Sequence, residues 1–212
     1  MLLADARQTV AETGRRMIAE KLVEGTAGNI SIRVDDLVAI SPSTIPYDQI
    51  AAGDVCVVDL DGNVVAADGG RRPSSEVPMH LAIYRNTGAR AIVHHHGLRS
   101  AALSTVFDVV PPIHYYTVQL GGALRVADYA CFGSDRLAET VLRALENRNA
   151  ALMQNHGAVA YGDTLEQAYQ RARLVEWLCA MYIDAASVGT PRQLTDAELD
   201  EVNQVRANRI HA

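Results

Sequence analysis

Four short β-rich runs crowd into one stretch of the chain, and this clustering limits the fold more than any other feature of the sequence. The runs are residues 30–34, 37–40, 55–58 and 64–65, which are rich in the β-branched residues that favour strands. Turn-forming residues separate them, and Asp61, Gly62 and Asn63 make a sequence typical of a hairpin turn. The pattern therefore predicts hairpins in the first third of the chain.

Helical patterns flank these strands and alternate irregularly with two further strands. Apolar residues at helical spacing predict helices over 3–24, between Ser75 and about Asn86, and again from Ser134, Thr164 and Thr195. Short apolar runs predict strands at 91–96 and 150–153. This order indicates an α/β sandwich with a mixed or antiparallel sheet rather than regular βαβ winding. No repeat, linker or low-complexity segment divides the chain, so we expect one domain over residues 1–212.

The composition excludes several classes of protein. Hydrophobic residues make up 49% and charged residues 21% of the 212 residues, which excludes disorder over the whole chain. The formal net charge of −6 supplies no positive field, so we expect neither nucleic acid nor an anionic membrane as a partner. Cys56, Cys131 and Cys179 lie far apart, which suits a protein of the reducing cytoplasm. No apolar run approaches the ~20 residues of a membrane-spanning helix.

Three histidines occupy positions at which a metal site would form. Side chains alternate between the faces of a strand, so His94 and His96 are expected to project together while His95 points to the opposite face. His156 follows the strand at 150–153, in a turn. Three neutral imidazoles suit Zn²⁺ and leave a coordination position open. A pair such as His94 and His96 is more often structural when it stands alone, but a turn position for His156 favours function.

Glu76 follows two serines at the start of a predicted helix, where the helix dipole and free N–H groups stabilise a carboxylate. It is an ordinary first-turn glutamate or, if the helix start faces the histidines, a general base beside a metal that acidifies the proton being removed. The sequence leaves both interpretations open. We interpret His80 and His114 as structural residues or as residues that support the ligands.

Three loops rich in small polar residues form a candidate anion site. They lie at residues 25–29, 41–44 and 74–75. Their hydroxyl and backbone N–H groups would together chelate a phosphate without any lysine. Each loop alone is an ordinary turn, so only their combination carries the prediction.

Six short motifs in register resemble the class II aldolase and adducin family. They are residues 25–31 (GTAGNIS), 40–47 (ISPSTIPY), 74–76 (SSE), 94–96 (HHH), 112–115 (PIHY) and 155–157 (NHG). The matching order extends from about residue 7 to the last helix. Six motifs in one order are far more specific than any one of them, and the chain is identified as a member of this family by resemblance.

The resemblance implies a three-layer α/β/α sandwich around a mixed, largely antiparallel sheet. It also implies one Zn²⁺ per subunit and a homotetramer whose active sites lie at subunit interfaces. By position, His94, His96 and His156 match the zinc ligands, and Glu76 matches a carboxylate that approaches the metal and serves as catalytic base. Tyr115 matches a catalytic tyrosine lent by the adjacent subunit. The residues that match the phosphate-binding loops are Gly28, Asn29, Ser43, Thr44, Ser74 and Ser75.

The activity that the resemblance implies is zinc-dependent cleavage of a ketose 1-phosphate, such as L-fuculose 1-phosphate, to dihydroxyacetone phosphate and an aldehyde through an enediolate. Alternatives on the same fold are a sugar-phosphate dehydratase, a 4-epimerase and a decarboxylase. The epimerases of the family typically carry aspartate where this chain has Glu76, which favours the aldolase. A non-catalytic interaction module like the adducin head is a further alternative, and the retained histidines and Glu76 argue against it.

The sequence departs from the family pattern at three places. Thr44 stands where a glycine is expected in the second phosphate loop, and Val77 and Pro78 replace a tryptophan and an arginine after the glutamate. No tyrosine follows Tyr182, although the resemblance implies a second tyrosine in the C-terminal tail. The residues that would recognise the aldehyde part of the substrate are therefore the ones that the resemblance predicts least well.

Overall fold

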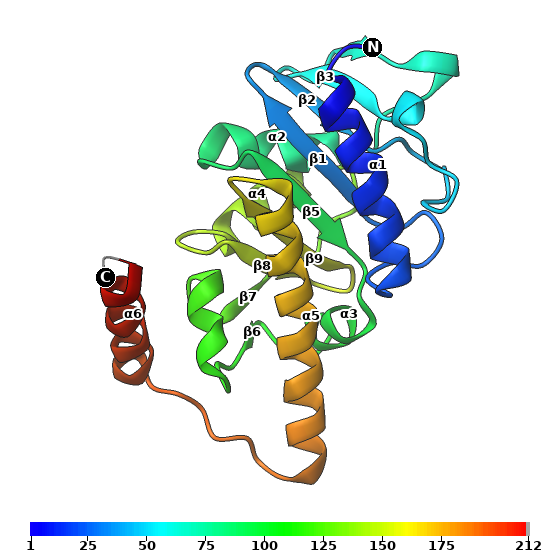
Figure 1. The fold of residues 1–212 in the computed structure, drawn as a ribbon. Coiled ribbons are helices and arrows are strands. Elements are labelled where there is room, and N and C mark those ends of the chain that lie inside the picture. Colours follow the sequence, from blue (N-terminus) through cyan, green and yellow to red (C-terminus); the bar gives the residue numbers. More distant parts are fainter. Residues whose placement is uncertain (211–212) are drawn as a thin grey trace.

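A twisted sheet runs through the molecule in the computed structural model, which describes residues 1–210 (Figure 1). Within these residues the sheet has nine strands in the order β4-β3-β2-β1-β5-β9-β8-β7-β6. The strands are β1 (Asn29–Val34), β2 (Leu37–Ile40), β3 (Cys56–Asp59), β4 (Val64–Ala66), β5 (Ala91–His95), β6 (Val109–Val110), β7 (Leu124–Ala127), β8 (Ala150–Met153) and β9 (Gly157–Gly162). The helices are α1 (Ala4–Ala19), α2 (Val77–Asn86), α3 (Leu98–Ser104), α4 (Asp135–Ala144), α5 (Leu165–Val188) and α6 (Asp196–Ile210).

Neighbouring strands run antiparallel except β7 and β8, which are parallel. This confirms the mixed, largely antiparallel sheet, and β1 to β4 are the expected hairpins. Strand β9 was not predicted, because it follows β8 after a short turn and its glycines and alanines are weak strand formers, although Val159 and Tyr161 favour a strand. It lies between β5 and β8, so the strand at 150–153 neighbours β9 rather than the histidine strand.

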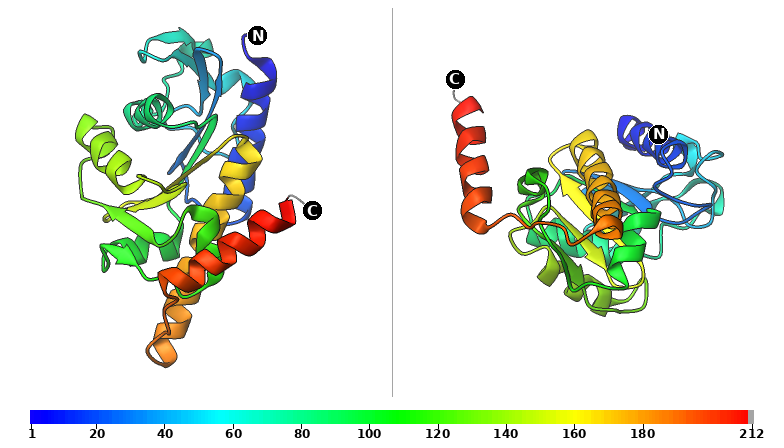
Figure 2. Two further views of the ribbon diagram at one scale, coloured as in Figure 1. Left: turned by 90° about the vertical axis from the view of Figure 1, so that its left-hand side faces the viewer. Right: turned by 90° about the horizontal axis from the view of Figure 1, so that it is seen from below.

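Helices cover both faces of the sheet, as two views at right angles to Figure 1 show (Figure 2). Helices α1, α3 and α5 pack on one face, and α2 and α4 pack on the other. Adjacent residues of β5 belong to opposite layers, since Val93 packs toward α5 and Ile92 packs toward α2 and α4. The predicted three-layer α/β/α sandwich is therefore confirmed, and the even-numbered residues of β5 face α2.

The first helix ends earlier than the predicted boundary at residue 24. Lys21 adopts a left-handed backbone with φ of 58°, which ends the helical path after Ala19. The turn directs Leu22 and Val23 into the core, where both are buried. Their apolar character, which suggested a continuing helix, reflects burial beyond the helix end.

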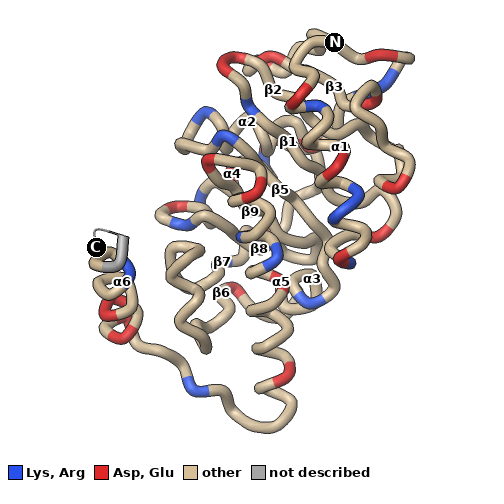
Figure 3. The backbone as a smooth tube through the Cα atoms, in the orientation of Figure 1, with Lys and Arg blue, Asp and Glu red and all other residues tan. Residues whose placement is uncertain are grey.

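Beyond α5 the chain leaves the sandwich, and α6 stands apart from the sheet (Figure 2). The connecting segment is fixed by a hydrogen bond from N of Leu194 to O of Pro112, at 2.9 Å. Charged residues lie mainly on the outer helices and loops, and β5, β8 and β9 carry no Lys, Arg, Asp or Glu (Figure 3). Among the described residues, no helix has the length and apolar character to cross a membrane.

Candidate active site

Three imidazole rings converge on the α2 face of the sheet. His94 lies on β5, His96 follows the end of that strand on the same side, and His156 comes from the turn between β8 and β9. The ring centroids lie 4.7, 4.9 and 4.8 Å apart. One nitrogen of each ring lies within 4.8 Å of the others. The structure thus brings together the three histidines that the sequence selected, while His95 lies on the opposite face of β5.

Two backbone features place His156 beside His94. Asn155 adopts a left-handed conformation with φ of 56°, which closes the short turn between β8 and β9. Gly157 then begins β9, and a Cβ atom there would lie 2.3 Å from the carbonyl oxygen of His95. Only glycine permits this approach of the two strands, so the sequence Asn-His-Gly is what holds the third histidine in place.

Hydrogen bonding and burial prepare the histidines as metal ligands. Nδ1 of His94 donates to the carbonyl oxygen of Ala158 at 2.8 Å, which directs its Nε2 toward the centre, 2.9 Å from Nε2 of His96. Burial, with the neighbouring His94, lowers the pKa of His96 to about 3 and that of His156 to about 4. Both rings are therefore neutral at pH 7, which is the form that binds a metal.

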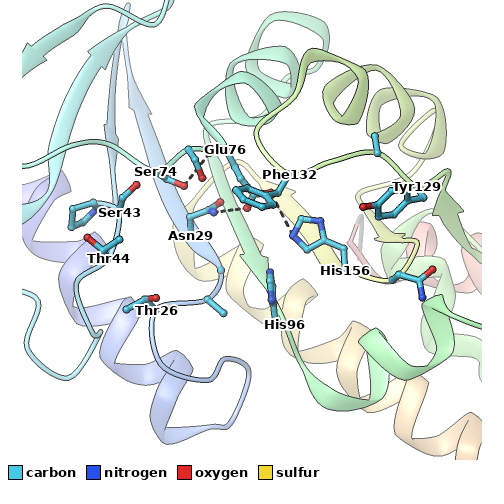
Figure 4. A pocket seen from close by; sticks show the side chains of 16 residues that line it. Thr26, Asn29, Ser43, Thr44, Ser74, Glu76, His96, Tyr129, Phe132 and His156 are labelled. Atoms are coloured by element: carbon cyan, nitrogen blue, oxygen red, sulfur yellow. Dashed lines mark hydrogen bonds and ion pairs between the residues drawn. The ribbon is translucent and has the colours of Figure 1, made fainter.

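Glu76 immediately precedes α2, as its N-cap, and turns its carboxylate toward the histidines (Figure 4). Oε2 accepts a hydrogen bond from Nδ2 of Asn29 at 2.7 Å and lies 3.0 Å from Nε2 of His94. Oε1 is buried, lies 3.5 Å from Nε2 of His156 and has no hydrogen-bond partner among the described residues. Burial alone would raise the pKa of Glu76, but His94, His156 and Asn29 outweigh it and hold that pKa below its usual range. The carboxylate is ionised at neutral pH.

This set of side chains fits a divalent metal ion. A buried, ionised carboxylate oxygen without a partner is costly unless a cation or a substrate group satisfies it. Three neutral imidazoles and a carboxylate are favoured ligands of Zn²⁺. His94, His96, His156 and Glu76 are therefore the residues that could hold the metal, and the start of α2 faces the histidines as the second interpretation of Glu76 required.

A cavity of about 380 Å³ opens beside the histidines and Glu76 (Figure 4). No lysine or arginine appears among the residues that line it in the described part of the chain. The lining includes all six residues of the expected phosphate loops, Gly28, Asn29, Ser43, Thr44, Ser74 and Ser75. Loops from three distant parts of the sequence thus meet at one cavity, next to the histidines.

Some of these polar groups hold the loops together and others remain available to a ligand. Ser43 Oγ donates to the carbonyl oxygen of Pro73 at 2.9 Å, and Ser74 Oγ accepts from N of Glu76 at 3.2 Å. The hydroxyl groups of Thr26, Thr44 and Ser75 bond to no other residue in the described chain. An anion in the cavity would therefore meet hydroxyl donors near the N-terminus of α2, whose dipole favours negative charge.

Backbone conformation explains two residues of these loops. Gly28 has φ of 76°, and a Cβ atom there would lie 2.6 Å from the carbonyl oxygen of His94, so glycine is required where this loop crosses β5. Thr44 also has a positive φ, 64°, in the region that favours glycine. The departure from the family pattern at residue 44 therefore introduces a strained β-branched residue into the cavity wall.

Tyr115 lies outside this cavity. It begins the short 3₁₀ helix Tyr115–Leu120, is exposed, and stacks on His114 with ring centroids 4.6 Å apart. Tyr116 and Trp177 complete an exposed aromatic cluster around His114. The structure thus brings together every selected residue except Tyr115, which the sequence analysis assigned to the site of an adjacent subunit.

Sequence reasoning missed two aromatic residues of the cavity wall. Tyr129 and Phe132 line the cavity from the loop that follows β7, and both side chains are exposed (Figure 4). Gly133, with φ of 73°, lets this loop approach Ser75, since a Cβ atom there would lie 2.8 Å from the carbonyl oxygen of Ser75. A signal was present, because these two aromatics stand in a glycine-containing loop rather than in a strand or helix of the core.

Comparisons with known proteins agree with this geometry. The family described as "Class II Aldolase and Adducin N-terminal domain" matches residues 8–183. A 5-deoxy-D-ribulose 1-phosphate aldolase of Bacillus thuringiensis is 35% identical over 205 residues, which cover 95% of each chain. The L-fuculose phosphate aldolase of Escherichia coli K12 is 36% identical over 197 residues, which cover 92% of this chain and 90% of the relative. A solved L-fuculose 1-phosphate aldolase superposes with a TM-score of 0.92 at 33% identity, covering 98% of each chain.

Proposed function

Because the chain belongs to the class II aldolase and adducin family and is an enzyme of the lyase class, we propose that it cleaves a ketose 1-phosphate to dihydroxyacetone phosphate and an aldehyde, using one Zn²⁺ per subunit. One observation carries this proposal. The unpartnered Oε1 of Glu76 faces three imidazoles at the edge of a cavity whose walls offer free hydroxyl groups. When bound, the metal would act as a Lewis acid for the negative charge that develops on substrate oxygens.

Glu76 is the residue that we assign to proton exchange at carbon. Cleavage of the C3–C4 bond leaves the electron pair on C3, and the proton that C3 then receives is held at Oε1 of Glu76. The C4 hydroxyl gives its proton to water and becomes the aldehyde, and the ionised Glu76 takes up from water the proton that it passes to C3, so that one proton is lost and one is gained. The bond from Nδ2 of Asn29 fixes Oε2, so that Oε1 is the oxygen free to carry the proton.

The hydroxyl-rich wall supports a phosphorylated substrate. The relatives act by name on different sugars, and two of the names specify a 1-phosphate. We assign the phosphate to Gly28, Ser43, Thr44, Ser74 and Ser75, with Asn29 at the border between the phosphate and Glu76. Free hydroxyl groups and the start of α2 would bind this phosphate without lysine or arginine.

We also propose a cytoplasmic homotetramer in which Tyr115 acts in the active site of an adjacent subunit. Its position outside the cavity of its own chain supports this, because a tyrosine so exposed can reach a second copy. The neighbouring rings of His114, Tyr116 and Trp177 form an exposed aromatic surface of the kind that is enriched at interfaces. Cys56, Cys131 and Cys179 are unpaired, as a reducing compartment would keep them.

The test is a panel of ketose 1-phosphates, offered to the enzyme with and without added Zn²⁺. The panel contains the 1-phosphates of fuculose, ribulose and 5-deoxyribulose, and released dihydroxyacetone phosphate is measured by a coupled dehydrogenase. We expect release from at least one of them, lost with a chelator and restored by metal. No release from any ketose phosphate by metal-loaded enzyme would refute the proposal.

A further inference from the structure

A line of buried polar groups leads away from Glu76, between strand β1 and helix α2. Nδ2 of Asn29 donates to Oε2 of Glu76 at 2.7 Å, and Oδ1 of Asn29 meets Nε2 of His80 at 2.5 Å. Nδ1 of His80 meets Oγ of Ser31 at 2.7 Å, and that oxygen meets the hydroxyl of Tyr84 at 2.7 Å. All five side chains are buried. Only Glu76 and Asn29 reach the cavity.

The spacing of the sequence builds this line. Glu76, the N-cap of α2, and His80 and Tyr84 on the helix stand four residues apart, which places them on one side about 6 Å apart along the axis. Asn29 and Ser31 stand two residues apart on β1, on one strand face and about 6.8 Å apart. The spacing along the helix nearly equals the spacing along the strand. Each of the two strand residues therefore lies between two residues of the helix side and bonds to both.

Every proton in the line has a determined place. The Glu76 carboxylate only accepts, so the amide nitrogen of Asn29 faces it and the amide oxygen faces His80. That oxygen also only accepts, so His80 carries its proton on Nε2. The ring is fully buried and no carboxylate bonds to it, so it holds one proton, on Nε2, and its Nδ1 accepts from Ser31. The Ser31 oxygen then accepts from the hydroxyl of Tyr84, whose pKa burial raises.

We propose that His80, as the neutral tautomer with its proton on Nε2, is a positioning residue that fixes the amide of Asn29 with its nitrogen toward Glu76. Without this donor the amide of Asn29 keeps only one of its two anchors, so its nitrogen is no longer held at 2.7 Å from Oε2 of Glu76. Glu76 then loses the hydrogen bond that holds Oε2 in place. That bond is what keeps Oε1 oriented toward the reacting carbon. The role rests on the proposed function, but the tautomer is a property of the folded chain alone.

Three variants separate positioning from packing. His80→Gln retains an N–H donor at nearly the position of Nε2, whereas His80→Leu retains volume and no donor. Tyr84→Phe removes the far end of the line and leaves the bond between His80 and Asn29. For a ketose phosphate that the enzyme cleaves, we expect kcat of His80→Leu to fall about 10- to 100-fold, as for other lost supporting contacts at metal sites. KM should change little, because the hydroxyl groups assigned to the phosphate are untouched, and His80→Gln and Tyr84→Phe should stay within a few-fold of the unmodified enzyme.

Bound metal and the midpoint of thermal unfolding are measured for the same three variants. A packing role would lower these two quantities together with kcat, whereas a positioning role would lower kcat alone. Equal metal content with a selective loss of kcat in His80→Leu supports positioning. If Tyr84→Phe or His80→Gln loses as much turnover as His80→Leu, or if His80→Leu turns over normally, the proposal is overturned.

The tautomer is measured independently of turnover. In protein labelled with ¹⁵N-histidine, the signals that vanish in His80→Gln belong to residue 80, and their chemical shifts identify the protonated nitrogen. We expect a neutral ring protonated at Nε2 from pH 6 to 8, with and without Zn²⁺. A ring protonated at Nδ1 overturns the inference even in an active aldolase. An Nε2 proton in a protein that cleaves no ketose phosphate would instead leave the positioning of Asn29 standing and remove only the proposed reaction.

Discussion

Oε1 of Glu76 lies 3.5 Å from Nε2 of His156 and accepts no hydrogen bond from any described residue, although it is buried. The other carboxylate oxygen is held by Asn29 at 2.7 Å. The two oxygens of one side chain therefore have different surroundings. One is fixed by the protein, and the other is left to a metal ion or to the substrate.

Replacing Glu76 with glutamine should separate metal binding from turnover. In Glu76→Gln the amide oxygen would take the bond from Asn29, so an NH₂ group that cannot accept a proton would occupy the position of Oε1. Because general acid–base groups contribute about 10²- to 10⁴-fold, we expect kcat to fall by at least about 100-fold. Steady-state kinetics and metal analysis check this, with Glu139→Gln on the exposed side of α4 as the matched control. Turnover near that of the control would rule out the assigned role.

Removing a histidine should remove the metal. Changes to groups that only support a ligand cost about 10- to 100-fold in metal affinity, so loss of a ligand in His96→Ala or His156→Ala should cost more. Elemental analysis after dialysis should find about one divalent ion per unmodified chain and almost none in these variants. His114→Ala, in the aromatic cluster, is the control that should keep its metal. An unmodified chain that takes up no ion on soaking would favour a non-catalytic module.

The sequence sufficed for the parts of the fold and site that depend on local patterns. The strand period placed His94 and His96 on one face, and the hairpins of β1 to β4 followed from turn residues between β-branched runs. The family resemblance supplied the order of the motifs, and hence the meeting of three loops at one cavity. Those predictions depend only on the spacing and order of residues along the chain.

Features that depend on tertiary contact could not be predicted. The position of β9 between β5 and β8 is set by sheet pairing, which its local sequence, with alanines alternating with Val159 and Tyr161, does not reveal. The sequence indicated a structural or supporting role for His80 but not its partners, because Asn29 and Ser31 come from a strand about 50 residues away. The positive φ of Thr44 was likewise not predictable, because a β-branched residue rarely adopts it.

Acid should destabilise the protein partly through His80. Its pKa is lowered from 6.5 to about 3 by burial, so below pH 6.5 the unfolded chain binds a proton that the folded chain does not. Stability is therefore lost as the pH falls from 6.5 toward 3, at up to about 1.4 kcal/mol per pH unit. The unfolded chain of His80→Leu has no imidazole at residue 80 to protonate, so this variant should lose less stability in acid. The difference in free energy of unfolding between the unmodified protein and His80→Leu should therefore be about 1–2 kcal/mol smaller at pH 5 than at pH 7. Denaturant titrations of metal-free protein measure this, and Tyr84→Phe, which keeps His80, should retain the pH dependence of the unmodified chain.

Thr44→Gly should relieve backbone strain while weakening phosphate binding. The left-handed conformation destabilises the folded state of a residue with a side chain by about 1–2 kcal/mol. Glycine avoids this strain, but its greater freedom in the unfolded chain lowers stability by about 0.5–1 kcal/mol. We therefore expect the free energy of unfolding to rise by up to about 1 kcal/mol. The same substitution at Thr9, inside α1, should lower it by about 0.3 kcal/mol, since threonine is itself a weak helix former. If the Thr44 hydroxyl contacts the phosphate, KM should also rise about 10-fold, as expected for a lost bond to a charged group. Destabilisation equal to that at Thr9 would contradict the strain at residue 44.

A tyrosine that acts across an interface can be identified by mixing two inactive variants. Tyr115→Phe and Glu76→Gln should each lose at least about 100-fold in turnover, whereas Tyr116→Phe, the matched control in the same cluster, should stay close to the unmodified enzyme. If each site takes Glu76 from one chain and Tyr115 from its neighbour, co-unfolding and reassembling the two inactive variants in equal amounts restores about a quarter of the sites. If both groups come from the same chain, no site recovers. Activity in the mixture, with an oligomer seen by light scattering, supports the shared site, and a monomer that stays fully active on dilution refutes it.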